Sequence, residues 1–149
     1  MPSQEMVFTV MLPVDVVWSF MSDRRAVGCL FPGCKGVKIL NDLDSIWTVT
    51  FSLGPFSRTI ELTARTEELI ENERLSWTAA HEHLVTSGTV TFRKISDDET
   101  EVTYRLEGHV TGHFAFLQDI VVAEKLGELA RGFVKSIKER LELKAVKGT

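Results

Sequence analysis

Residues 123–141 read AEKLGELARGFVKSIKERL, a pattern with one charged side and one apolar side. Charged residues such as Lys125, Glu128 and Lys135 cover the first side. The apolar residues recur every three or four positions, which places them on one face of an α-helix: Ala123, Leu126, Ala130, Phe133, Ile137 and Leu141. The helix is predicted to extend over about 30 residues, or ~45 Å. Its long apolar face must pack against a second layer.

The preceding segment, residues 37–110, predicts that second layer, because apolar and polar side chains alternate along it as they do in strands. Two of the predicted strands cover residues 46–53 and 56–70, separated by the turn signal Gly54-Pro55. Clean alternation gives a sheet with one covered face and one wet face, which is typical of antiparallel pairing. The turn between residues 82 and 85 contains no Gly, Pro or Asn, so its position stays open.

The N-terminal part predicts one more strand and two short helices. A β-rich run over residues 6–12 stops at Pro13, which is suited to the first position of a short helix. Asp23 can cap a second short helix that runs to about Leu30. The predicted class is therefore α+β, in which a curved sheet wraps around the long helix. Because the two surfaces curve differently, a gap is expected between them.

Composition places the chain among ordinary globular proteins. It has 149 residues, 44% hydrophobic and 26% charged, which predicts a single domain over residues 1–149. The net charge of −4 argues against a nucleic-acid partner, which would call for a basic face. No apolar run approaches the ~20 residues of a membrane-spanning helix. The N-terminus does not resemble a signal peptide, and with two cysteines this predicts a cytoplasmic protein.

Motifs that would bind a metal or a phosphate fail on spacing or context. The stretch Gly28–Lys35 has the outline of a phosphate loop, but Cys34 interrupts the Gly-Lys-Ser/Thr ending. The run His81-Glu82-His83 resembles the start of a zincin motif, but Val85 stands where the second zinc-binding histidine is needed. Cys29 and Cys34 with His81 and His83 lack the spacing of a zinc knuckle. No cofactor and no metal are predicted.

Several segments together resemble one known family. They are Val7–Val10, Pro13-x-x-x-Val17-Trp18, Asp23, Cys29-Leu30-Phe31-Pro32-Gly33-Cys34, Gly54-Pro55, Gly112 and Leu126…Phe133. Over residues 5–142 the chain resembles the CoxG family, named for a subunit of carbon monoxide dehydrogenase, in the START/Bet v 1-like superfamily. The resemblance implies a helix-grip fold, with seven antiparallel strands around the C-terminal helix and an apolar cavity between them. It also implies binding of a lipid- or quinone-like molecule and a role in tying a molybdenum hydroxylase, such as carbon monoxide dehydrogenase, to the membrane.

The predicted ligand site lies on inward-facing positions of the sheet and the helix. Small residues among large ones on the helix predict an apolar cavity of about 300–1,000 Å³. The parity of His81 and His83 leaves open whether they orient a ligand or hydrogen-bond within the sheet. No residue is assigned a catalytic role. The predicted ligand-binding residues are Trp47, Phe51, Leu62, Trp77, His81, Phe92, Tyr104, Leu106, Leu126, Ala130 and Phe133.

Three kinds of function are compatible with this pattern. The favoured one is a non-enzymatic module that binds an apolar small molecule and serves a molybdenum hydroxylase. The second is an enzyme resembling polyketide cyclases and dehydratases, with His81, His83 and Tyr104 as acid/base groups. The third is an assembly factor that binds no ligand and acts through its surface.

Basic residues outnumber acidic ones from Lys135 onward, although the whole chain is acidic. Cations at a helix C-terminus complement the helix dipole, which is the simpler interpretation. The alternative is transient docking of this segment to an anionic membrane or to an acidic face of a partner enzyme. In that case the protein is peripheral on the inner face of the membrane.

Overall fold

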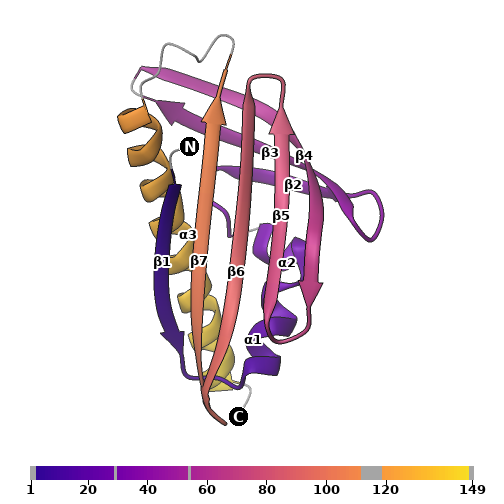
Figure 1. The fold of residues 1–149 in the computed structure, drawn as a ribbon, viewed down its shortest axis with the longest axis vertical. Helices are drawn as coiled ribbons and strands as arrows, with labels where there is room; N and C mark the ends of the chain where they lie inside the picture. The colour runs from indigo at the N-terminus through magenta and orange to yellow at the C-terminus, as the bar shows by residue number, and fades with distance from the viewer. Residues whose placement is uncertain (1–2, 29, 54, 112–118, 148–149) are drawn as a thin grey trace.

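A computed structural model describes residues 3–28, 30–53, 55–111 and 119–147, with only the backbone described for residues 51, 53, 56, 119–121 and 144–147. Its strands and helices follow the order expected from the sequence (Figure 1). Their bounds are β1 Ser3–Val10, α1 Val14–Met21, α2 Arg24–Gly28, β2 Cys34–Ile39, β3 Asp44–Leu53, β4 Phe56–Ile70, β5 Arg74–His81, β6 Leu84–Ser96, β7 Glu99–Val110 and α3 Asp119–Lys147.

The strands form one seven-stranded antiparallel sheet in the order β1-β7-β6-β5-β4-β3-β2. β1 therefore crosses over to pair with β7, while every other strand pairs with its neighbour in sequence. α3 runs behind β1 and β7 along the length of the sheet, and α1 and α2 lie at its lower end (Figure 1). The structure confirms the predicted α+β architecture, including the 29-residue C-terminal helix.

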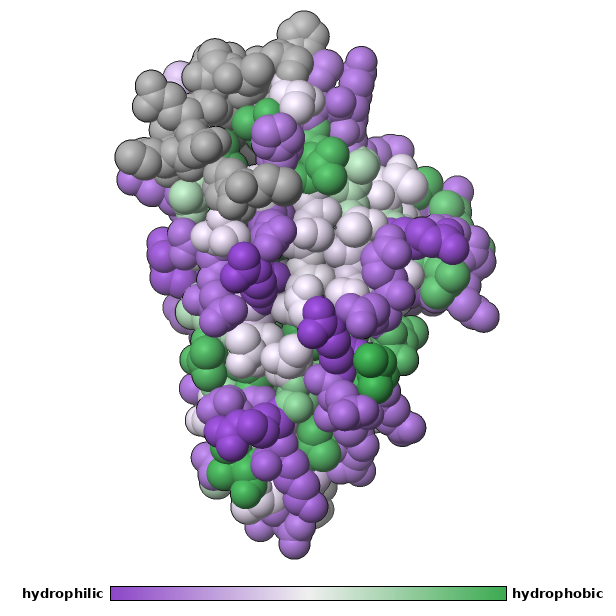
Figure 2. Space-filling model, in the orientation of Figure 1, coloured by the Kyte–Doolittle hydropathy of each residue, from purple (hydrophilic) through white to green (hydrophobic). Residues whose placement is uncertain are grey.

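The two faces of the sheet differ in polarity, as the alternation predicted. Figure 2 shows the outer face of β5, β6 and β7, where pale and purple side chains dominate. Residues of this face include Ser87, Thr89, Thr91, Thr103, Arg105 and Glu107. The opposite, concave face carries buried apolar residues of the same strands, among them Val90, Phe92, Val102 and Leu106. β-Bulges at Thr66/Glu68 and Lys94/Ser96 add local bends to the sheet.

The two short helices begin close to the residues that the sequence singled out. Pro13 directly precedes α1 instead of opening it, because its ψ of 150° is extended, and its carbonyl accepts from the N–H of Val16 and of Val17. Asp23 caps α2: its Oδ1 accepts from the backbone N–H of Arg25 at 3.1 Å and of Ala26 at 3.2 Å. The helix ends at Gly28, two residues before the predicted end.

α3 buries the predicted apolar stripe. It also buries most of the side chain of Lys125, which the sequence places on the charged side. Leu126, Ala130, Phe133, Ile137 and Leu141 are all buried, and Ala123 is partly buried. Lys125 was expected on the charged side, but its side chain is only 18% exposed. Its hydrocarbon stem covers apolar surface while its Nζ lies 3.5 Å from Glu128 Oε1.

The turn between α2 and β2 depends on a glycine. Gly33 has a φ of 81°, a conformation that L-residues rarely adopt, and its carbonyl accepts from the N–H of Thr50 at 2.8 Å. A Cβ at this position would lie 2.1 Å from the carbonyl oxygen of Thr50. Since Thr50 belongs to β3, this contact fixes α2 and the turn against the sheet.

We therefore expect Gly33→Ala to lower the free energy of unfolding by about 1–3 kcal/mol, through backbone strain and the clash with Thr50. Urea denaturation followed by circular dichroism measures this change. Gly36→Ala is the matched control, because a Cβ there meets no atom within 4 Å. Equal stability of the two variants would contradict the interpretation.

Candidate ligand-binding cavity

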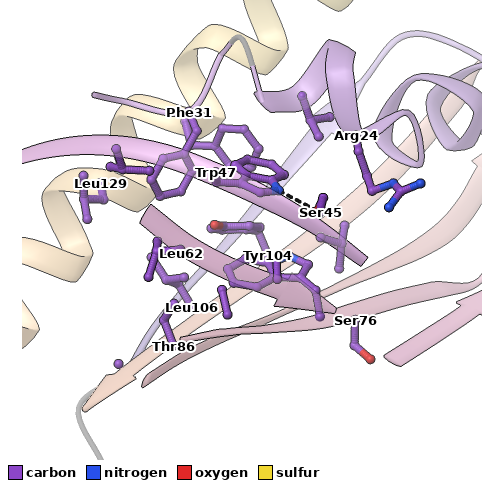
Figure 3. Close-up of a pocket in the computed structure, with 18 of the residues that line it drawn as sticks. Arg24, Phe31, Ser45, Trp47, Leu62, Ser76, Thr86, Tyr104, Leu106 and Leu129 are labelled. Carbon is purple, nitrogen blue, oxygen red and sulfur yellow. Dashed lines mark hydrogen bonds between the residues drawn. The ribbon is translucent and has the colours of Figure 1, made fainter. Parts of the chain in front are cut away.

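A cavity lies between the concave face of the sheet and the helices (Figure 3). Its lining comes from β3 to β7, from all three helices of the described chain and from Phe31, and it is almost wholly apolar. The volume is about 180 Å³. This is smaller than the predicted range of about 300–1,000 Å³, because large aromatic side chains project into the space.

Four aromatic rings form one continuous wall of the cavity. Trp47 of β3 meets Phe31 with ring centroids 6.5 Å apart and the planes at 90°. Phe31 lies 5.4 Å from Phe133 of α3, and Phe133 lies 5.3 Å from Tyr104 of β7. Tilted and edge-to-face pairs of this kind are favourable beyond the area that they bury. The wall therefore connects β3 with β7, which lie near opposite edges of the sheet, through Phe133 of α3.

The floor of the cavity is made of small residues. Ala64 of β4 and Ala79 of β5 are direct cross-strand partners, and both are buried. Gly88 of β6 pairs with Trp77, whose indole lies flat over it: a Cβ on Gly88 would be 2.3 Å from Trp77 Cζ2. On β7, a Cβ at Gly108 would lie 3.1 Å from Leu126 Cδ2. The two alanines thus leave space above the sheet, whereas Trp77 and Leu126 cover the two glycines.

The lining of the cavity reaches the protein surface at β4, and we take this as its opening. Of the lining residues, Arg65 and Leu69 are the exposed ones, and Leu69 is 54% exposed. Arg65 is held by the Asp44 carboxylate, with N–O distances of 3.0 and 3.1 Å. Arg24 binds the same residue through the backbone: its guanidinium is directed away from the cavity and donates to the carbonyls of Asn41 and Asp44 (Figure 3).

A small polar cluster stands beside this opening. Ser76 lines the cavity, and its hydroxyl donates to Glu68 Oε1 at 3.0 Å. The Ser76 hydroxyl and, after it, the Arg74 guanidinium hold the pKa of Glu68 below its usual value. The carboxylate is therefore charged at neutral pH and orders the end of β4 against β5.

Most polar groups that line the cavity have hydrogen-bond partners within the protein. Trp47 Nε1 donates to Ser45 Oγ at 2.9 Å, and Thr86 Oγ1 donates to the Glu107 carbonyl at 2.6 Å. Tyr104 differs: it is 1% exposed, and its hydroxyl has no hydrogen-bond partner among the described residues. Burial raises the pKa of Tyr104 well above its usual value, so the hydroxyl stays protonated and can donate.

The cavity includes seven of the residues that the sequence predicted to bind ligand. They are Trp47, Leu62, Trp77, Tyr104, Leu106, Leu126 and Phe133. Phe92 and Ala130 are buried in the core outside the cavity lining, where Phe92 packs edge-on against Trp18 with centroids 5.5 Å apart. The side chain of Phe51 lies outside the described residues. Contact of any of these residues with a ligand stays a prediction.

The histidines lie near the two-residue turn Glu82–His83, which joins β5 to β6. His81 is not part of the cavity lining, and its Nδ1 is 3.2 Å from the Glu61 carbonyl oxygen. This geometry matches the interpretation in which it hydrogen-bonds within the sheet. His83 Nε2 is 3.8 Å from Glu82 Oε1. His109 is exposed, and His113 lies outside the described residues.

One of the two cysteines, Cys34, belongs to the described part of the chain. Cys34 Sγ is 3.6 Å from the Gly36 carbonyl, and Cys29 lies outside the described residues. Within the described part of the chain, no three His, Cys, Asp or Glu side chains gather in a way that could hold a metal ion.

Sequence reasoning missed several lining residues. Phe31 lies in the segment that carries the family resemblance, but the sequence assigns it no role in the site. Met21 and Val27 come from the short helices, whose apolar faces could have indicated them. Lys125 carried no signal, because a lysine on a charged helix face is normally solvated.

The comparisons with known proteins agree with this architecture. Residues 7–142 match the model of the CoxG family, which is named for a subunit of carbon monoxide dehydrogenase. The chain belongs to the CoxG family. Together, this family and the START-like fold suggest a ligand-binding role. The sequence has no significant match among curated proteins.

Solved structures with similar folds cover almost the whole chain. A conserved protein from Geobacillus kaustophilus has a TM-score of 0.83 at 14% identity, covering 95% of this chain and 96% of its own. A START superfamily protein from Mycobacterium smegmatis has a TM-score of 0.79 at 17% identity, covering 95% and 97%. An aromatase/cyclase from a Streptomyces species has a TM-score of 0.69 at 17% identity, covering 96% and 94%. At these identities the likeness shows the fold alone.

The contact between Trp77 and Gly88 gives a test of how the Trp77 ring, which lines the cavity, packs against β6. Gly88→Ala should force the indole away from β6, lowering the free energy of unfolding by about 1–3 kcal/mol, as overpacking does. The near-ultraviolet circular dichroism of the tryptophans should change with it. Gly108→Ala is the control, since its nearest contact is a flexible leucine methyl at 3.1 Å. A larger effect at Gly108 than at Gly88 would contradict the arrangement.

Proposed function

We propose that the protein binds an apolar small molecule, of a lipid- or quinone-like class, in the cavity between the sheet and α3, without chemical turnover. The observation that carries this proposal is the cavity itself: about 180 Å³ of space with an almost wholly apolar lining and an opening at Leu69. In another protein an apolar cavity of ~150 Å³ takes up benzene. The space here therefore accommodates a ring-sized part of a ligand, and a longer tail can leave through the opening.

Native mass spectrometry of freshly purified protein tests whether a ligand is retained. We expect a species heavier than the denatured chain by the mass of one small molecule. Toluene is a suitable probe for the emptied protein, with binding measured by isothermal titration calorimetry. Neither a bound molecule nor toluene binding in the wild type would overturn the proposal and favour a factor that acts through its surface.

Filling the floor of the cavity should weaken binding. Ala79 is 6% exposed and lines the cavity, whereas its neighbour Ala80 is exposed on the other face of β5. We expect Ala79→Phe to weaken toluene binding by about tenfold or more (~1.4 kcal/mol). The matched variant Ala80→Phe should bind as the wild type does, and equal binding by both variants would place the probe elsewhere.

Enzymatic turnover is the competing function, since the fold is shared with an aromatase/cyclase. The predicted acid/base candidates are His81, His83 and Tyr104, but both histidines are outside the cavity lining while Tyr104 is part of it. This separation supports binding over catalysis. Turnover of a cyclase-type substrate that is lost in a folded His81→Ala variant would overturn the non-enzymatic proposal.

An accessory role next to a molybdenum hydroxylase, such as carbon monoxide dehydrogenase, is part of the same proposal. It is supported by the family to which the chain belongs. A tagged form of the protein should co-purify with the hydroxylase of its own organism. Retention of the tagged protein without the hydroxylase would contradict this role.

Transient contact with an anionic membrane is the last part of the proposal. No helix in the described residues is long and apolar enough to cross a bilayer. The basic surplus after Lys135, with Lys138 and Arg140 on α3, supports peripheral contact, at ~1 kcal/mol for each cation near the membrane. In co-sedimentation with anionic vesicles at low salt, the wild type should bind more than a Lys138/Lys144/Lys147→Glu variant. If the wild type and the variant both bind negligibly, the proposed membrane contact is wrong, and the basic residues are explained by their interaction with the helix dipole.

A further inference from the structure

We infer that Tyr104 is the polar recognition point of the cavity, and that its hydroxyl donates a hydrogen bond to an acceptor oxygen, such as a carbonyl, on an otherwise apolar ligand. The inference rests on the proposed function and adds the chemical class of the ligand and its orientation. It starts from a group that the folded protein leaves unpartnered.

The Tyr104 hydroxyl is exceptional among the buried polar atoms of the described chain. Two buried side-chain atoms lack a partner, Asn72 Oδ1 and Tyr104 Oη, and Asn72 is not part of the cavity lining. Other hydroxyls of the lining are already donating, Ser22 to the Trp18 carbonyl at 2.7 Å and Ser76 to Glu68. Among the buried hydroxyls of the described lining, Tyr104 Oη is therefore the one with no hydrogen-bond partner.

Tyr104 lines the cavity, and its hydroxyl is buried from solvent. The ring is fixed by Phe133 at 5.3 Å, and its edge faces the space between Trp47 and Leu62 (Figure 3). A phenol is more acidic than an alcohol, and in apolar surroundings it is a strong donor. Donation to a ligand would satisfy a group whose burial is otherwise costly.

The same geometry orients the ligand. The opening lies on β4, and Tyr104 lies on β7, three strands away in the order β7-β6-β5-β4. With strands ~4.8 Å apart, the hydroxyl-bearing strand is roughly 14 Å from the opening across the sheet. The ligand's oxygen-bearing end is thus the deep end, and its apolar end faces Leu69.

A matched pair of probes tests the inference. Acetophenone carries a carbonyl, and α-methylstyrene has nearly the same shape with a CH₂ group in place of the oxygen. Titration calorimetry should show that Tyr104→Phe weakens binding of acetophenone by about tenfold, the value of one hydrogen bond of ~1.4 kcal/mol, and leaves α-methylstyrene unchanged. Thr86→Val is the control, because the Thr86 hydroxyl already donates to Glu107. It should affect both probes alike.

A spectroscopic signature separates hydrogen bonding from a change in packing. With acetophenone labelled by ¹³C at the carbonyl, the carbonyl resonance should move downfield on binding to the wild type more than on binding to Tyr104→Phe. Thermal unfolding establishes that the variant is folded. If both probes bind and the variant changes neither the affinity nor the resonance, the role of Tyr104 is refuted while the proposed function stands. If neither probe binds the wild type, both fail together.

Discussion

The rest of the structure depends on the mismatch between a straight helix and a curved sheet. α3 packs chiefly against β1 and β7, at one side of the sheet. The bulge at Thr66/Glu68 accompanies the bend that carries β4 and its neighbours away from that contact. The concave face of β3 to β5 therefore meets no long helix, and its apolar residues face a shared space. A cavity follows from the geometry of the two layers before any particular ligand is considered.

The ends of this space are closed by groups that contribute stability as well as shape. Ile137 and Leu141 are fully buried on the C-terminal half of α3, together with Val17 of α1. The Phe31 ring packs between Trp47 and Phe133 and closes the side of the cavity. A tightly packed end thus compensates for a loosely packed middle, since buried apolar area contributes ~25 cal/mol per Å² wherever it lies.

The architecture could be predicted from sequence because each strand and helix produces its own short-range pattern of apolar residues. Alternation gave the strand faces of residues 46–70 nearly to the residue, and the three- and four-residue steps gave the buried face of α3. The site was predicted only in part. Phe31 and Lys125 enter the lining through packing between distant segments, which no local pattern encodes. The volume was overestimated because alternation tells which way Trp47 and Trp77 point, and not how much space their rings fill.

The remaining question is why a tyrosine occupies position 104 at all. A cavity optimised only for stability would hold a phenylalanine here, because an unpartnered buried hydroxyl costs about 1–3 kcal/mol. The neighbouring core shows that phenylalanine is available to this sheet, since Phe92 faces Val102 across β6 and β7 and is also buried. The hydroxyl therefore adds nothing to folding that a plain ring would not add. A hydrogen bond to a ligand, as inferred above, gives this buried hydroxyl a role that a phenylalanine could not fill.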